Sequence, residues 1–90
     1  MSNQIDIGHG VTISFYEYKG VRAGLIEEHP SAKSATGRCN GAVAFRIPEN
    51  PGASPAWDVV QAEPLTLSPS LLCRTCGHHG FIRDGKWVSA

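Results

Sequence analysis

The sequence has no excess of charge of either sign, because its 90 residues include eight Lys and Arg and eight Asp and Glu. A nucleic-acid-binding domain usually carries a basic excess or a basic stripe along one face. The basic residues Lys19 and Arg22, for example, are offset by Glu17, Glu27 and Glu28. The charge pattern therefore argues against nucleic acid as a partner, and we expect another protein instead.

Long apolar runs are also absent. No stretch approaches the roughly 20 apolar residues of a transmembrane helix, and the first ten residues lack the basic and apolar regions of a signal peptide. We therefore expect a cytoplasmic protein, in the host cytoplasm if the gene belongs to a phage. Cysteine is scarce as well: three thiols are an odd number, and the cytosol keeps thiols reduced. This favours metal binding or catalysis over a disulfide framework.

Helical periodicity is missing too, since no amphipathic run of adequate length has the period of a helix. Ten Gly and six Pro indicate many turns and short elements. Alternating apolar and polar residues, rich in β-branched and aromatic types, predict strands over four segments: residues 11–18, 21–26, 42–47 and 57–63. Pro30 and the small polar residues around it predict a loop over residues 27–41. The expected fold is a small all-β domain spanning residues 1–90.

The clearest local pattern lies in residues 81–88. Asp84-Gly85 stands between two short apolar–polar runs, and Asp-Gly favours a two-residue type I′ turn because both central residues need positive φ. The pattern predicts a C-terminal β-hairpin, with Phe81 and Trp87 near each other across it.

A Cys-x-x-Cys turn precedes this hairpin. The spacing of Cys73 and Cys76 lets two thiolates from one tight turn bind a tetrahedral metal, with sulfur about 2.3 Å from the ion. Gly77 follows, where a positive φ would allow backbone N–H groups to turn toward the sulfurs. A cysteine turn that leads into a short hairpin is the layout of half a zinc ribbon. We therefore predict that this turn binds Zn²⁺.

A closed zinc site needs four ligands. His78 and His79 are adjacent, so we expect at most one to reach the ion, and His79 is favoured because the chain first turns at Gly77. Cys39 also lies in a glycine-flanked turn just before a predicted strand. The predicted ligands are Cys39, Cys73, Cys76 and His79. Should Cys39 be a buried core thiol, or should His79 point away, the alternatives are His9, His29 and His78.

Other uses of the Cys-x-x-Cys pair fit its surroundings poorly. A thioredoxin-like pair opens a helix, which the residues after Cys76 do not favour. A c-type haem needs histidine where Gly77 stands, and a zinc deaminase needs proline where Leu72 stands. An open catalytic zinc remains an alternative, with Glu27 or Glu28 as general base. The protein would then be a metal-dependent hydrolase of peptide or isopeptide bonds.

Two serines, Ser68 and Ser70, flank Pro69 just ahead of the first predicted ligand. They could line a groove beside the metal, but we expect their hydroxyls to hold this extended segment by bonding nearby backbone groups. No serine lies in a G-x-S-x-G elbow. We therefore predict no catalytic residue, and the sequence favours a binding role over an enzyme.

The segment LTLSPSLLCRTCGHHGFIRDGKWV resembles the C-terminal signature of an uncharacterised family of small bacterial and phage proteins. In that signature Ser-Pro-Ser is followed by a cysteine near Cys-x-x-His, then by aromatic-Ile-Arg-x-Gly and a closing Trp or Val. The resemblance implies a zinc-ribbon-like β domain. Some members of that family are encoded near genes of ubiquitin-like conjugation and phage defence, so the resemblance also implies work on other proteins. We accordingly expect a small protein-interaction module with one structural zinc.

Overall fold

The computed structural model describes residues 4–90, which form nine strands in three antiparallel sheets and contain no helix. The largest sheet has the order β1 (Ile5–Gly8), β2 (Val11–Tyr18), β3 (Val21–Pro30) and β4 (Arg38–Ala44). A second sheet pairs β5 (Asp58–Gln61) with β6 (Thr66–Ser68). A third has the order β7 (Leu71–Leu72), β8 (His79–Arg83) and β9 (Lys86–Ser89). The all-β prediction is confirmed. Because residues 4–90 contain no helix, none of their elements is a membrane-spanning helix.

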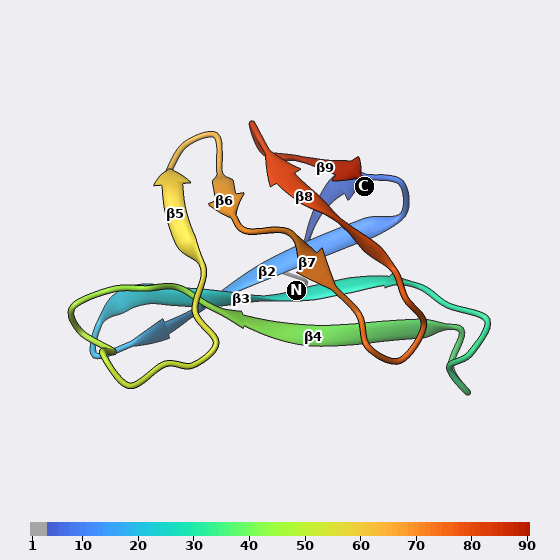
Figure 1. Ribbon diagram of the computed structural model, residues 1–90, viewed down its shortest axis with the longest axis horizontal. Helices are drawn as coiled ribbons and strands as arrows, with labels where there is room; N and C mark the ends of the chain where they lie inside the picture. Colours follow the sequence, from blue (N-terminus) through green and yellow to red (C-terminus); the bar gives the residue numbers. More distant parts are fainter. Residues whose placement is uncertain (1–3) are drawn as a thin grey trace.

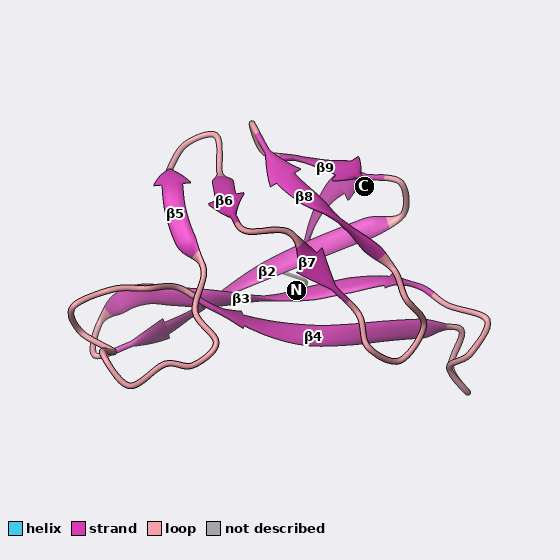
Figure 2. Cartoon of the chain, viewed as in Figure 1, coloured by secondary structure: helices cyan, strands magenta, loops and turns pink. Residues whose placement is uncertain are grey.

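The two smaller sheets lie over one face of the four-stranded sheet (Figure 1), and one long irregular loop, residues 45–57, leads from β4 to β5 (Figure 2). The core lies between these layers. Val11 and Leu25 of the large sheet and Ile82 of β8 are fully buried there. Removing apolar surface from water in this way stabilises the fold by about 25 cal/mol per Å². The remaining buried side chains of this cluster are Ile7, Ile13, Val43, Phe45, Leu65, Leu67, Leu71 and Trp87.

The long strands follow the predicted alternation but extend further than expected. The turn between β2 and β3 falls at Lys19-Gly20, where both residues have positive φ, as a tight hairpin requires. The predicted loop over residues 27–41 is wrong at both ends, because β3 continues to Pro30 and β4 begins at Arg38. The composition of this segment is typical of turns. Its two ends nevertheless belong to β3 and β4, which pair with each other.

The C-terminal hairpin is confirmed. Asp84 and Gly85 have φ of 51° and 75°, and the β8–β9 register closes around them. Ile82 stands opposite Trp87, whereas Phe81 stands opposite Val88. Since successive side chains point to opposite faces of a strand, Trp87 faces the core and Phe81 lies on the other face. The expectation that Phe81 and Trp87 lie near each other across the hairpin is therefore corrected: Ile82 is the residue opposite Trp87.

Candidate metal centre and serine–histidine pair

Four candidate ligands converge at the end of the molecule where the Cys-x-x-Cys turn meets the large sheet. Their ligand atoms all lie within 4.8 Å of one another. Metal–sulfur bonds of about 2.3 Å in a tetrahedron place ligand atoms roughly 3.8 Å apart, so the group is the right size for one ion. Three cysteines and one histidine are a common donor set of structural zinc sites. The group that could hold a metal ion consists of His29, Cys39, Cys73 and Cys76.

These ligands come from two layers of the fold. His29 and Cys39 are directly opposite each other in the β3–β4 register, so their side chains share one face. The other two belong to the turn between β7 and β8, which is closed by hydrogen bonds of 2.8 Å from Cys73 N–H to the His78 carbonyl and from Gly77 N–H to the Cys73 carbonyl. A bound ion would therefore join the turn to the large sheet.

The structure brings three of the four predicted ligands together and places His29 with them instead of His79. Strand alternation explains His29: Ala23, Leu25, Glu27 and His29 are all buried on the inner face of β3. Because Glu27 and His29 are polar, the apolar alternation of the sequence stops before them and did not reveal their burial. His79 lies outside the group, at the start of β8, and its side chain is exposed.

The two other histidine alternatives also lie outside the four-residue group. His78 stacks between His29 and Trp87, with ring centroids 4.0 Å and 4.6 Å away. Burial, together with the charge of His29, lowers the pKa of His78, which favours the neutral ring. His9 occupies the turn between β1 and β2 with a φ of 56°, in keeping with a turn role.

A buried carboxylate supports the histidine of the group. Glu27 Oε1 lies 2.7 Å from His29 Nδ1, and His29 Nε2 lies 3.2 Å from Cys76 Sγ. A carboxylate that accepts Nδ1–H fixes the tautomer in which Nε2 carries the lone pair for a metal. Burial raises the pKa of Glu27, although its bond with His29 opposes the rise. Burial lowers the pKa of His29, but its hydrogen bonds with Cys76 and Glu27 outweigh this and raise it overall.

The group also favours a thiolate before any ion arrives. A backbone hydrogen bond from His78, assisted by the side chain of His29, lowers the pKa of Cys76 to about 6. At neutral pH the Cys76 sulfur is therefore mainly the thiolate, which is the form that binds metals. Glycine at position 77, with a φ of 78°, gives the turn the conformation that this bonding needs.

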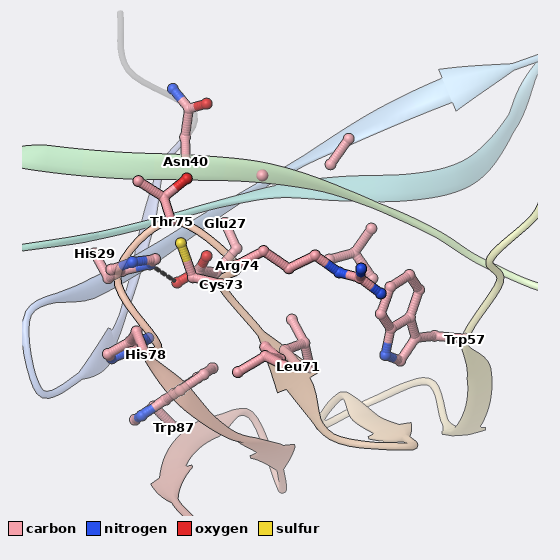
Figure 3. A pocket seen from close by; sticks show the side chains of 14 residues that line it. Glu27, His29, Asn40, Trp57, Leu71, Cys73, Arg74, Thr75, His78 and Trp87 are labelled. Carbon is pink, nitrogen blue, oxygen red and sulfur yellow. Dashed lines mark hydrogen bonds and ion pairs between the residues drawn. The ribbon is translucent and has the colours of Figure 1, made fainter. Parts of the chain in front are cut away.

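A pocket of about 180 Å³ adjoins the group, between residues 40–43 of β4 and residues 71–75 at the end of β7. Figure 3 shows Arg74 extending along this pocket toward Trp57, with Glu27 and His29 at the opposite end. The pocket is thus bounded by the candidate metal centre at one end and by the indole of Trp57 at the other.

A serine and a histidine meet just beyond the Trp57 end. His79 Nε2 lies 2.8 Å from Ser70 Oγ, and among residues 4–90 no other serine–histidine side-chain hydrogen bond is present. Leu72 is opposite His79 in the β7–β8 register, so Ser70 is the diagonal neighbour of His79 on the same face. The indole N–H of Trp57 donates to the Ser70 carbonyl at 3.2 Å, which fixes the backbone of the serine.

This contact departs from the expectation that Ser70 bonds the backbone. The pair is accessible, because Ser70 is half-buried and His79 is exposed. A serine hydroxyl within hydrogen-bond reach of an imidazole is the arrangement that activates a serine nucleophile. The available signal in the sequence was the Cys-x-x-Cys turn itself, which folds residues 70 and 79 back onto each other.

A comparison with protein families matches residues 16–90 to a family described as "Bacterial ubiquitination-like system serine protease (BubE)". The chain belongs to the BubE family. The bacterial kinship expected from the C-terminal signature is confirmed, but the BubE description names a serine protease and not a zinc ribbon. No curated protein and no solved structure matches the chain.

Proposed function

We propose that this BubE family member is a serine hydrolase that cleaves a peptide or isopeptide bond in a protein of a bacterial ubiquitination-like system. Ser70 is the nucleophile and His79 is the general base. The observation that carries the proposal is the 2.8 Å contact between His79 Nε2 and Ser70 Oγ. The family description supports the reaction class and the kind of protein substrate, and the accessibility of both side chains suits a macromolecule.

The two residues suffice for a balanced acyl-transfer reaction. His79 Nε2 takes the hydroxyl proton as Ser70 Oγ attacks the substrate carbonyl carbon. The imidazolium then gives this proton to the leaving amine as the C–N bond breaks, and an acyl ester on Ser70 remains. Water, deprotonated by His79, attacks the ester, and the serine leaves with the proton. The products are a carboxylic acid, a free amine and the restored enzyme.

We further propose that the metal is Zn²⁺ and that its role is structural. Three thiolates and His29 fill all four positions of a tetrahedral site, which leaves none for a reacting water. The open-zinc hydrolase considered from the sequence has less support, because its candidate base Glu27 accepts a hydrogen bond from His29. Bound at this place, zinc would hold the hairpin that carries Ser70 and His79 against β3 and β4.

A serine-directed fluorophosphonate tests the nucleophile. The probe should label one residue, identified by mass spectrometry as Ser70, and Ser70→Ala should abolish both labelling and cleavage of a fusion whose N-terminal part is a ubiquitin-like protein. Ser68→Ala is the matched control on the other side of Pro69 and should keep both. Full cleavage by Ser70→Ala, or labelling of a different residue, would overturn the assignment.

Elemental analysis tests the metal. The purified protein should carry about one zinc per chain, as expected for a closed four-ligand site. His79→Gln should keep this zinc while losing activity, because His79 is assigned to the reaction and not to the ion. Loss of the zinc from His79→Gln would return this residue to the ligand set.

A further inference from the structure

We propose that the free edge of β7 binds an extended segment of the polypeptide substrate by strand addition, through the backbone N–H and C=O of Leu72. The proposal rests on the function proposed above, since it assigns the substrate site of the Ser70–His79 pair. It specifies the class of substrate: a chain that is extended and flexible on at least one side of the scissile bond.

The direction of the Leu72 backbone follows from the bonds around it. Cys73 N–H donates to His78, on the β8 side. Because N–H and C=O groups of successive strand residues alternate in direction, those of Leu72 point away from β8. The bonding of His79, the residue opposite Leu72, is consistent with this. Its carbonyl points away from β7 and accepts a hydrogen bond from Ala90 N–H at 3.1 Å. Across residues 4–90, no backbone group outside the β7–β8 pair bonds Leu72.

The position of the Leu72 N–H and C=O relative to Ser70, the proposed nucleophile, is also defined. Ser70 precedes Leu72 by two residues, just before β7, so its backbone groups point to the same edge as those of Leu72 and its side chain to the same face. The Ser70 carbonyl on that edge is already bonded by the indole of Trp57. A substrate strand that pairs with Leu72 therefore extends toward Ser70 and ends at Trp57. There a backbone carbonyl of the substrate reaches the serine hydroxyl.

Space for such a strand exists beside the edge. The pocket between β4 and β7 lies directly alongside Leu72. On the β4 wall, Gly41 has no side chain, and a Cβ built there would meet no atom within 4 Å. At about 180 Å³, the pocket is smaller than the roughly 300–1,000 Å³ typical of small-molecule sites. It would therefore hold only part of an extended chain, which would continue along the edge beyond the pocket.

The open groups themselves identify the occupant. One donor and one acceptor, aligned along a strand edge, are complementary to the backbone of a peptide and to few other ligands. Leu72 is 57% exposed, and the flexible side chain of Arg74, which extends along the pocket, would move aside for the incoming strand. A second copy of this chain, paired edge to edge, is the competing occupant.

Two substitutions at one position separate the backbone from the side chain. Leu72→Pro removes the outward N–H and no bond to β8, and proline is tolerated on edge strands. Leu72→Ala is the matched control that keeps the N–H. We expect kcat/KM for the ubiquitin-like fusion to fall about tenfold more in Leu72→Pro than in Leu72→Ala, because a net hydrogen bond is worth up to about 1.5 kcal/mol. Fluorophosphonate labelling of Ser70 and the zinc content should match in both variants.

A scan of N-methylated peptide substrates provides the second measurement. Strand addition predicts that methylation inhibits cleavage at one position and not at its two neighbours, because only the amide opposite Leu72 faces β7. This readout needs no variant enzyme, so it decides the question even if Leu72→Pro misfolds and loses zinc.

The possible results distinguish strand addition, the hydrolase function and self-association at the edge. Equal kcat/KM in the two Leu72 variants, or uniform tolerance of N-methylation, would overturn strand addition while labelling of Ser70 still supports the hydrolase. Absence of labelling in the wild type would overturn the hydrolase itself. A dimer in solution that Leu72→Pro dissociates would assign the edge to a second copy and reject the substrate site.

Discussion

Glu27→Gln tests whether the carboxylate behind His29 tunes the metal centre. The change keeps an oxygen near His29 Nδ1, which lies 2.7 Å from the carboxylate, but removes its charge. A hydrogen bond to a charged group is worth about 1.5–3 kcal/mol, against about 0.5–1.5 kcal/mol for a neutral pair. The difference is about 1–1.5 kcal/mol, so the affinity for zinc should fall by up to about tenfold. This lies at the lower end of the 10–100-fold range for outer-shell partners of metal-bound histidines.

The metal-free protein should respond differently. Glu27 is only 6% exposed, and its burial raises its pKa, which means that the charged form is held there at a cost. Replacing this charge by a neutral amide removes that cost. We therefore expect Glu27→Gln to leave the stability of the metal-free protein unchanged or slightly higher, whereas zinc should stabilise the variant by about 1–1.5 kcal/mol less than the wild type.

Competition with a chromogenic chelator measures the affinity, and urea unfolding with and without zinc measures both stabilities. The matched control is Glu28→Gln at the next position, where the carboxylate faces the surface and pairs with Arg38 at 3.1 Å. Pairs of this kind contribute about 0–1 kcal/mol, so the control should keep the zinc affinity. Equal affinities in Glu27→Gln and Glu28→Gln would refute the orienting role of Glu27.

Three further substitutions probe the turn, the sheet and the ligand set. Gly85→Val places a β-branched residue at a φ of 75° and should destabilise the protein by more than about 1 kcal/mol in urea unfolding; an unchanged midpoint would contradict the assigned turn. Gly80→Ala puts a Cβ 2.6 Å from Trp87 Cε2 and should cost about 1–3 kcal/mol by overpacking, whereas Gly52→Ala, which meets open space, should not; similar costs for both would argue against the close packing. His29→Ala should lose stoichiometric zinc in elemental analysis, and full retention would exclude this residue as a ligand.

The parts of the fold that follow from local rules could be predicted from the sequence. Alternation defined β2, and Asp84-Gly85 defined the last hairpin, because both patterns act over a few residues. The end of β3 could not be predicted in this way. Glu27 and His29 are polar, so they read as loop residues, yet they are buried on the inner face of the strand. Their burial depends on each other and on the cysteines, which are distant in sequence.

In the candidate site, too, local patterns predicted some residues, whereas others depended on how distant segments pair. The three cysteines were found from spacing and from flanking glycines, since these features are local. The choice between His29 and His79 depended on which face of a strand each occupies, and that was fixed only by the register of β3 with β4 and of β7 with β8. The Ser70–His79 contact is a diagonal across a two-residue strand, a relation that no one-dimensional motif records.

The metal centre and the serine–histidine pair are joined by one short hairpin, and this links stability to the proposed chemistry. β7 is two residues long, too short to hold a catalytic geometry through ladder bonds alone. The turn at Cys73 and Cys76 closes this hairpin at the end next to the ligand group, and Trp57 fixes it at Ser70. A chain of 90 residues has a modest core, and metals often supplement cores of this size. Zinc at the turn would thus support the position of Ser70 and His79 without taking part in the reaction. The need for metal and the identity of the nucleophile are for this reason separate properties of the same hairpin.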